Sequence, residues 1–294
     1  GVSRTVVREA ISRLQAAGMV ETRHGVGTFV VGAGDVSSFR IEPTPSDRIL
    51  RVTRHVALGQ YRCASDHPHF AHPAPYASPR VAFHRCSLSL RSGPDRGIVT
   101  PLHVSLHNPW QLQTHETIGK SGAHYDWIAL APEFLRMLRA RHFGVCEERD
   151  EYLFAHSICE ITPQTFLARC RLFTAATRPL EALGSRQIDD AVEHLLVQIL
   201  REAGACSRLA HAQRRHARGR RVQFVEEAKA VLARDYQAEL SATDIAQRLH
   251  CSTAYLSRTF HAATGYKLVD YRHELRLRRG AYLIEEDDAD IGEV

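Results

Sequence analysis

Residues 241–265 read SATDIAQRLHCSTAYLSRTFHAATG and hold two short helical segments separated by a tight turn. Ser241 is a good helix N-cap, and Asp244 three residues later completes an acidic variant of the capping box. Ser252 begins the second segment after a turn around His250 and Cys251, and Gly265 ends it. Two short helices joined in this way are typical of a helix-turn-helix that reads DNA.

In a helix-turn-helix the second helix lies in the major groove, so its exposed side chains must reach bases or phosphates. Leu256 and Phe260 lie four residues apart and are expected to face the first helix. Five other residues of this helix are expected to face outward: Thr253, Ala254, Ser257, Arg258 and His261. Arg258 can donate two parallel hydrogen bonds to one guanine. The alternative is an ordinary helical hairpin with a solvated polar face.

Composition places this sequence among globular proteins. The chain has 294 residues, which favours two domains, and 44% of them are hydrophobic, which excludes disorder and collagen. No apolar stretch approaches the roughly 18 residues of a membrane helix, and no secretory signal is recognisable, so we expect a cytoplasmic protein without membrane contact. Seven scattered cysteines without a CxxC pair favour reduced thiols over disulfides or a zinc site.

A strongly basic segment precedes the helical end of the chain. Residues 207–221, SRLAHAQRRHARGRR, contain six arginines and no acid. Such a segment commonly contacts polyanions, although many charge runs are solvated linkers. We expect five of these arginines to attract DNA phosphates: Arg214, Arg215, Arg218, Arg220 and Arg221.

The middle of the chain has the pattern of short strands followed by helices. Residues 32–50 are rich in Gly, Ser and Pro and read as a linker. From about residue 51, short segments such as 80–93, 96–109, 110–119 and 124–132 end in Gly, Pro or Asn, which favours a small antiparallel sheet or barrel. Helical periodicity returns at Pro132 and includes a long span from Arg186 to about His216. The expected fold class is therefore α+β.

Eighteen histidines raise the question of a metal site. Three of them, His67, His69 and His72, lie close together among prolines in an expected loop. Four more lie on expected strands: His84, His103, His107 and His115. We expect no metal and no cofactor, because no nearby HxH with a following Glu completes a cupin-type ligand set. No Ser-His-Asp or Cys-His arrangement and no phosphate-binding loop favours an enzyme.

Residues 223–284 resemble the first DNA-binding subdomain of the AraC/XylS family of transcription regulators. Their order of helix, turn, reading helix, Gly and linker helix (268–284) matches that family, and the resemblance implies that Ala254, Ser257 and Arg258 contact bases. The stretch from Tyr61 through WIALAPEFL is similar to the family's sensory domains, which implies a cupin-like barrel that binds an effector, followed by helices that dimerise. Only residues 290–294 match the start of the family's second reading unit.

The first thirty residues, GVSRTVVREAISRLQAAGMVETRHGVGTFV, resemble the second half of a GntR-type winged helix. The resemblance implies that Ser3, Arg4 and Arg8 contact bases and phosphates, and that His24 and Gly25 at the hairpin tip enter the minor groove. The first two helices of a winged helix are missing, so we expect the chain to be a fragment.

These observations predict five segments: a partial winged helix (1–31), a linker (32–50), an effector-sensing and dimerisation domain (51–205), a basic linker (206–221) and a DNA-binding domain truncated after its linker helix (222–294). The expected function is a transcription regulator that couples an unknown small-molecule effector to binding of double-stranded promoter DNA, with a homodimer as a possible assembly. Two alternatives stay open: a ligand-binding and dimerisation module without effective sequence-specific DNA binding, and a metal-dependent cupin enzyme.

Overall fold

The computed structural model describes residues 20–23, 27–30, 44, 46–73, 75–93, 95–118, 122–144, 153–177, 184–216 and 220–287, and not the side chains of 20–23, 27–30, 205–221 and 286–287. Antiparallel sheets combined with helices confirm the expected α+β class. The described strands are β1 (Val20–Arg23), β2 (Gly27–Val30), β3 (Asp47–Val52), β4 (Val56–Cys63), β5 (Arg80–His84), β6 (Leu88–Ser92), β7 (Asp95–Val99), β8 (His103–His107), β9 (Gln113–Thr117), β10 (Ala123–Leu130) and β11 (Ile158–Glu160). The described helices are α2 (Pro132–Phe143), α3 (Pro163–Thr177), α4 (Ser185–His216), α5 (Arg220–Arg234), α6 (Ala242–Arg248), α7 (Thr253–Thr264) and α8 (Leu268–Asp287).

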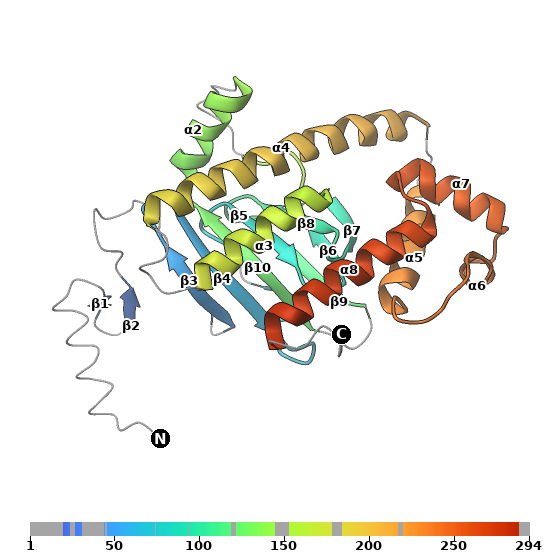
Figure 1. Ribbon diagram of the computed structural model, residues 1–294, viewed down its shortest axis with the longest axis horizontal. Coiled ribbons are helices and arrows are strands. Elements are labelled where there is room, and N and C mark those ends of the chain that lie inside the picture. The colour runs from blue at the N-terminus through green and yellow to red at the C-terminus, as the bar shows by residue number, and fades with distance from the viewer. Residues whose placement is uncertain are drawn as a thin grey trace.

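The strands form three antiparallel sheets. The large sheet has the order β11-β8-β5-β10-β4-β3, and a smaller sheet has the order β7-β6-β9. The hairpin β1-β2 pairs Val20 with Val30 and stands apart from the other strands (Figure 1). This pairing confirms the hairpin that the winged-helix resemblance of the first thirty residues implies.

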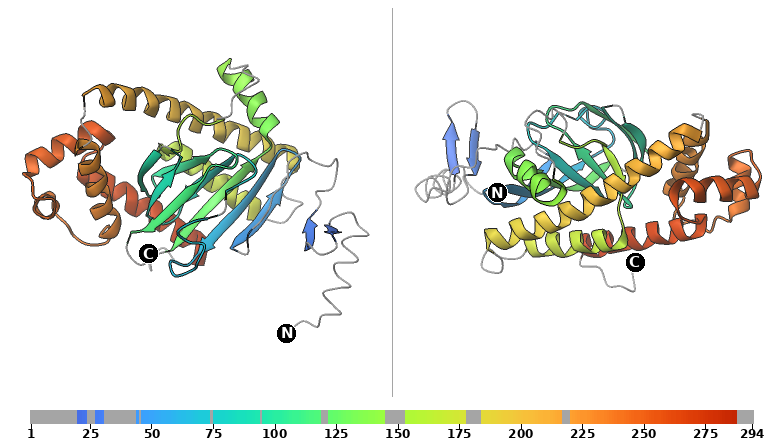
Figure 2. Two further views of the ribbon diagram at one scale, coloured as in Figure 1. Left: turned by 180° about the vertical axis from the view of Figure 1, so that it is seen from behind. Right: turned by 90° about the horizontal axis from the view of Figure 1, so that it is seen from above.

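The large sheet separates two layers of the part of the chain for which the sequence predicts a sensing role, residues 51–205, which is called the sensor below. On one face of the large sheet, called the outer face, Phe83 of β5 packs against Phe173 of α3, with the ring centroids 6.2 Å apart. On the other face, Ser92 of the small sheet lies 3.4 Å from His107 of β8, so the small sheet covers the inner face. Helices α3, α4 and α8 lie on the outer side (Figure 1, Figure 2). The inner face is therefore enclosed between two sheets.

Helix α4 has the apolar stripe expected from its sequence. Ile188, Val192, Leu195, Leu196 and Ile199 are buried in the sensor core. The helix continues unbroken from Ser185 to His216, so residues 206–216 of the expected basic linker are helical. Helix α5 begins at Arg220, four residues later. The stripe packs within this chain, against α3 and β11.

Helices α5 to α8 gather at one end of the molecule and share a second apolar core (Figure 1). This core includes Leu256, Phe260, Tyr271 and Leu275, and it also takes in Leu102 from the turn before β8. Tyr282, near the far end of α8, belongs instead to the sensor core. Each core therefore contains a side chain from the other half of the chain. Among the described residues, no helix combines the length and apolar character that a bilayer span requires.

Candidate nucleic-acid interface

Helix α6 begins with the capping box that its sequence predicts. The Ser241 hydroxyl accepts a hydrogen bond from the Asp244 amide at 3.1 Å, and the Asp244 carboxylate accepts from the Ser241 amide at 2.8 Å. These hydrogen bonds to Ser241 lower the pKa of Asp244. Helix α7 begins similarly, because the Ser252 hydroxyl accepts from the Tyr255 amide at 3.2 Å. Both helix starts are thus fixed by local sequence.

The turn between α6 and α7 is tight. His250 adopts a left-handed backbone with φ of 51°, a conformation that non-glycine residues rarely take. The Cys251 amide then donates to the carbonyl of Ala246 at 3.0 Å, which closes the turn onto α6. Gly265 ends α7 with φ of 76° and donates to the carbonyl of His261 at 2.8 Å. The left-handed backbone conformations at His250 and Gly265 set the length and orientation of α7.

The inner face of α7 is locked against its neighbours. Leu256 and Phe260 are fully buried, as expected, and Ile245 of α6 is buried beside them. The Phe260 ring meets Tyr271 of α8 edge-on, with centroids 5.3 Å apart. Burying aromatic and aliphatic groups in this way holds α7 at a fixed angle to α6 and α8.

The outer face of α7 carries the residues that the sequence singled out. Ala254, Ser257, Arg258 and His261 are exposed, and Thr253 at the start of the helix is half-buried. The Arg258 Nε donates to the Ala254 carbonyl one turn earlier at 3.3 Å, so the guanidinium lies along the exposed face. This strip offers the Ser257 hydroxyl, the Arg258 guanidinium and the His261 imidazole as hydrogen-bonding groups.

Tyr255 is an exposed member of this helix that the sequence analysis did not select. It keeps 38% of its surface exposed while its ring packs on Phe224 of α5, with centroids 5.2 Å apart. A tyrosine supported on one side and open on the other can present its hydroxyl to a phosphate.

Other arginines of this subdomain serve structural roles. Arg276 donates to the carbonyls of Tyr236, Gln237 and Ala238, and Arg272 donates to that of Leu240. These bonds tie the loop between α5 and α6 to α8. The guanidinium groups of Arg272 and Arg276 are therefore engaged with the protein itself, whereas Arg258 of α7 is exposed.

Several predicted contacts lie outside the described residues. These are Ser3, Arg4, Arg8, His24, Gly25 and Arg218. Arg214 and Arg215 lie in α4, and Arg220 and Arg221 in α5, but their side chains are not described. Their contacts with phosphates stay predictions.

The inner face of the sensor sheet is polar and aromatic. Ser105 bridges two histidines, at 2.9 Å from His84 Nε2 and 2.8 Å from His107 Nε2. The hydroxyls of Tyr76 and Tyr125 lie 2.8 Å apart in the same interior. Sequence analysis placed His84 and His107 on strands but did not predict that they meet.

Burial keeps these histidines neutral. It is the main cause that lowers the pKa of His107 to about 3, with His115 and Arg80 contributing, and it lowers the pKa of His115 to about 4. The same burial holds the pKa of His84 well below its usual value. Neutral imidazoles can each donate and accept one hydrogen bond.

Several polar atoms in this interior are not used by the protein. His84 Nδ1, His115 Nδ1 and Trp127 Nε1 are buried and have no hydrogen-bond partner within the described part of the chain. Arg80 Nε is also buried without a hydrogen-bond partner in the described residues. The Arg80 guanidinium stacks on two rings, with its Cζ 3.8 Å from the Tyr76 centroid and 4.4 Å from the Trp127 centroid. Leaving a buried polar atom without a hydrogen bond costs free energy, so each of these atoms can still gain from a hydrogen-bond partner.

The other histidines considered as metal ligands do not cluster with His84, His107 and His115. His67 and His69 are exposed in the loop after β4, and His72 is exposed nearby. His103 lies 3.0 Å from the Thr100 hydroxyl. Across the described residues, no three His, Cys, Asp or Glu side chains form a group able to hold a metal ion.

The sensor and the reading subdomain are joined through α8. Arg278 is buried and donates to the carbonyl of Ile161 at 2.9 Å and to that of Pro101 at 3.3 Å. Tyr282 packs edge-on against Phe166 of α3, with centroids 5.3 Å apart. Glu226 of α5 accepts from the Ile98 amide of β7. Direct contacts therefore connect the β-rich half of the described chain with helices α5 and α8.

Comparison with known proteins gives one family match and several similar regulators. Residues 1–30 match the model for bacterial regulatory proteins of the gntR family. The Msm operon regulatory protein of Streptococcus mutans serotype c is 30% identical over 71 residues, which are 24% of this chain and 26% of that protein. This chain thus matches about a quarter of that relative's length.

Two solved structures are also similar. ToxT from Vibrio cholerae is 9% identical, with 74% of this chain and 98% of that chain covered and a TM-score of 0.36. The AraC-like transcriptional activator CuxR is 12% identical, with 97% and 93% covered and a TM-score of 0.33. By sequence, the chain is similar to the gntR family model at residues 1–30 and to an operon regulatory protein over 71 residues.

Proposed function

We propose that this chain is a DNA-binding transcription regulator whose helix α7 reads bases in the major groove. The observation that carries the proposal is the helix-turn-helix itself. Its inner residues Leu256 and Phe260 are fully buried, while Ser257, Arg258 and His261 are exposed on the opposite face of the same helix. A helix whose buried face is fixed by packing and whose exposed face carries an arginine meets the requirement for direct base recognition.

Base reading and phosphate attraction have different sources in this proposal. Arg258 reads a base, and Thr253, Ala254, Ser257 and His261 provide the neighbouring contacts. The arginines of the basic segment supply sequence-independent attraction, each neutralised phosphate adding about 0.9 to the log-log salt slope. The GntR-like residues at 1–30 form a second contact with the duplex.

The sensor half, residues 51–205, binds a small polar effector between its two sheets. The polar atoms of Arg80, His84, His115 and Trp127 that have no partner within the described residues support this part of the proposal, because they are buried on strands β5, β9 and β10 of the two sheets. A ligand that bonds to them gains hydrogen bonds that the protein alone does not make. Its signal reaches α7 through α8, whose side chains Arg278 and Tyr282 lie in the sensor.

The test is selection of a binding site from random duplexes with the full chain, followed by gel retardation at moderate salt. The proposal predicts one enriched motif, retarded at least 10³-fold more tightly than unrelated DNA of equal length. Retardation of no duplex would favour a ligand-binding and dimerisation module instead. Sedimentation of the same sample, with and without DNA, tests the homodimer.

A further inference from the structure

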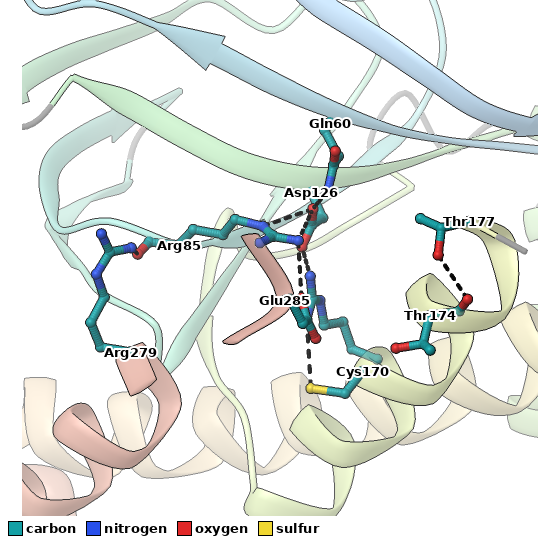
Figure 3. A network of polar contacts seen from close by, with 9 residues as sticks. Gln60, Arg85, Asp126, Cys170, Thr174, Thr177, Arg279 and Glu285 are labelled. Atoms are coloured by element: carbon teal, nitrogen blue, oxygen red, sulfur yellow. Dashed lines mark hydrogen bonds and ion pairs between the residues drawn. The ribbon is translucent and has the colours of Figure 1, made fainter. Parts of the chain in front are cut away.

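A four-charge cluster lies where the end of α8 meets the sensor (Figure 3). Asp126 of β10 is completely buried between two arginines. It accepts from Arg85 Nε at 3.0 Å and pairs with Arg169 of α3. Gln60 adds a third donor at 3.1 Å. One sensor carboxylate thus faces two buried guanidinium groups.

Glu285 completes the cluster from a different part of the chain. Its two carboxylate oxygens lie 2.7 and 2.8 Å from Arg169 Nη1, and one of them lies 3.0 Å from Arg85 Nη2. The arginine side chains are 2% exposed or less, whereas the Glu285 side chain is 22% exposed. Glu285 is therefore the more exposed partner of two buried sensor arginines, whose guanidinium groups also stack on the Tyr282 ring of α8 at 4.8 Å (Arg85) and 4.5 Å (Arg169).

The surroundings of the cluster are electropositive. Arg279 of α8 donates to the main-chain carbonyl of Arg85, which brings a third guanidinium close. The pKa of His124 is lowered to about 3, mainly by burial and in addition by the positive charges of Arg85, Arg62, Arg279 and Arg169. Two guanidinium groups fixed by a buried carboxylate, in a positive field, form a receptor for a further carboxylate.

We propose that Arg85 and Arg169 form a carboxylate-binding site of the sensor, which Glu285 occupies in this structure as an internal ligand. A small molecule with a carboxylate group competes with Glu285 for the two arginines and frees the end of α8. The regulatory meaning of this competition rests on the proposed function, because α8 carries the reading subdomain. The site itself does not depend on DNA binding.

The Glu285→Ala variant tests the site by chemical rescue. This substitution removes four heavy atoms, which are those of acetate, so acetate fits the space that it opens. Thermal unfolding of the full-length variant is measured in sodium acetate and in sodium chloride at matched ionic strength. We expect a lower midpoint than wild type in chloride and a rise with acetate, since each tenfold increase above the dissociation constant multiplies the folded-to-unfolded ratio by about ten.

Matched controls separate this site from general effects of acetate. Glu239→Ala removes a glutamate that also pairs with an arginine, Arg276 at 3.0 Å, but is 83% exposed, so acetate and chloride should act equally on it. The double variant Glu285→Ala with Arg169→Gln should lose the acetate response. An equal response of Glu285→Ala to both salts overturns the proposal.

Two further outcomes are decisive. If Glu285→Ala does not fold in chloride, it is refolded from urea in each salt: recovery in acetate alone supports the site, and failure in both overturns it.

Because no DNA is present in this assay, acetate rescue of Glu285→Ala supports the site even if the chain retards no duplex. A retarded duplex without acetate rescue would leave the regulator proposal intact and remove this site.

Discussion

Replacing Arg278 by Met tests whether α8 holds the two halves of the molecule together. Arg278 is 1% exposed, and its guanidinium donates to the carbonyls of Ile161 at 2.9 Å and Pro101 at 3.3 Å. Its Nε also donates to Glu274 at 2.8 Å. Methionine keeps most of the apolar stem but leaves these acceptors without their charged donor. Hydrogen bonds to charged groups contribute about 1.5–3 kcal/mol each, so losing the two bonds to the sensor should cost about 3–6 kcal/mol.

The measurement is urea unfolding of the full chain, followed separately by signals from the sensor and from the helical end. The wild type should unfold in coincident transitions, and Arg278→Met should lower the stability and separate the two signals. Leu277→Ala is the neighbouring control, because Leu277 is 69% exposed and should change stability by no more than about 0.5 kcal/mol. An Arg278→Met variant as stable as this control would refute the reasoning.

Three further predictions concern other parts of the molecule. Arg258→Ala should leave the unfolding free energy within about 0.5 kcal/mol and cost about 1–3 kcal/mol of discrimination at one base pair in binding titrations; equal loss on every sequence would remove its base-reading role. Gly59→Ala should destabilise the sensor by about 1–3 kcal/mol in thermal melts, because the added Cβ falls 2.8 Å from the Arg48 carbonyl and closer still to the Trp127 indole; an unchanged melt would contradict this packing. Lowering the pH from 6.5 to about 4 should reduce stability, since the unfolded chain then protonates histidines that the fold keeps neutral, by up to about 1.4 kcal/mol per pH unit for each. His115→Gln should flatten this dependence, and a flat wild-type profile would show that the interior histidines are not shielded.

The helix-turn-helix could be predicted closely because its signals are local. Ser241 and Ser252 cap α6 and α7, and Gly265 ends α7. Each signal acts within one helical turn, so sequence spacing alone locates it. The buried stripe of α4 was likewise visible as helical periodicity.

The polar contacts inside the sensor could not be predicted in the same way. Asp126 reads as a solvated residue of an alternating strand, yet it is buried because Arg169 of α3 lies against it. The link from Arg278 to Pro101 spans 177 residues, and that from Glu285 to Arg85 spans 200. Pairing across such separations depends on which faces of the sheet and helices meet, and periodicity does not encode that choice. The meeting of His84 with His107 through Ser105 depends on strand register in the same way.

The central claim, that the exposed face of α7 lies against base edges, is tested most directly by photo-crosslinking from position 257. A photoreactive amino acid replaces Ser257 in one sample and the exposed Leu277 of α8 in another, and each is irradiated on a selected duplex. We predict crosslinks from position 257 to bases at one defined step of the motif, and none above background from position 277. Crosslinks from 257 that are absent, or equal to those from 277, would contradict the assignment of α7 as the reading helix.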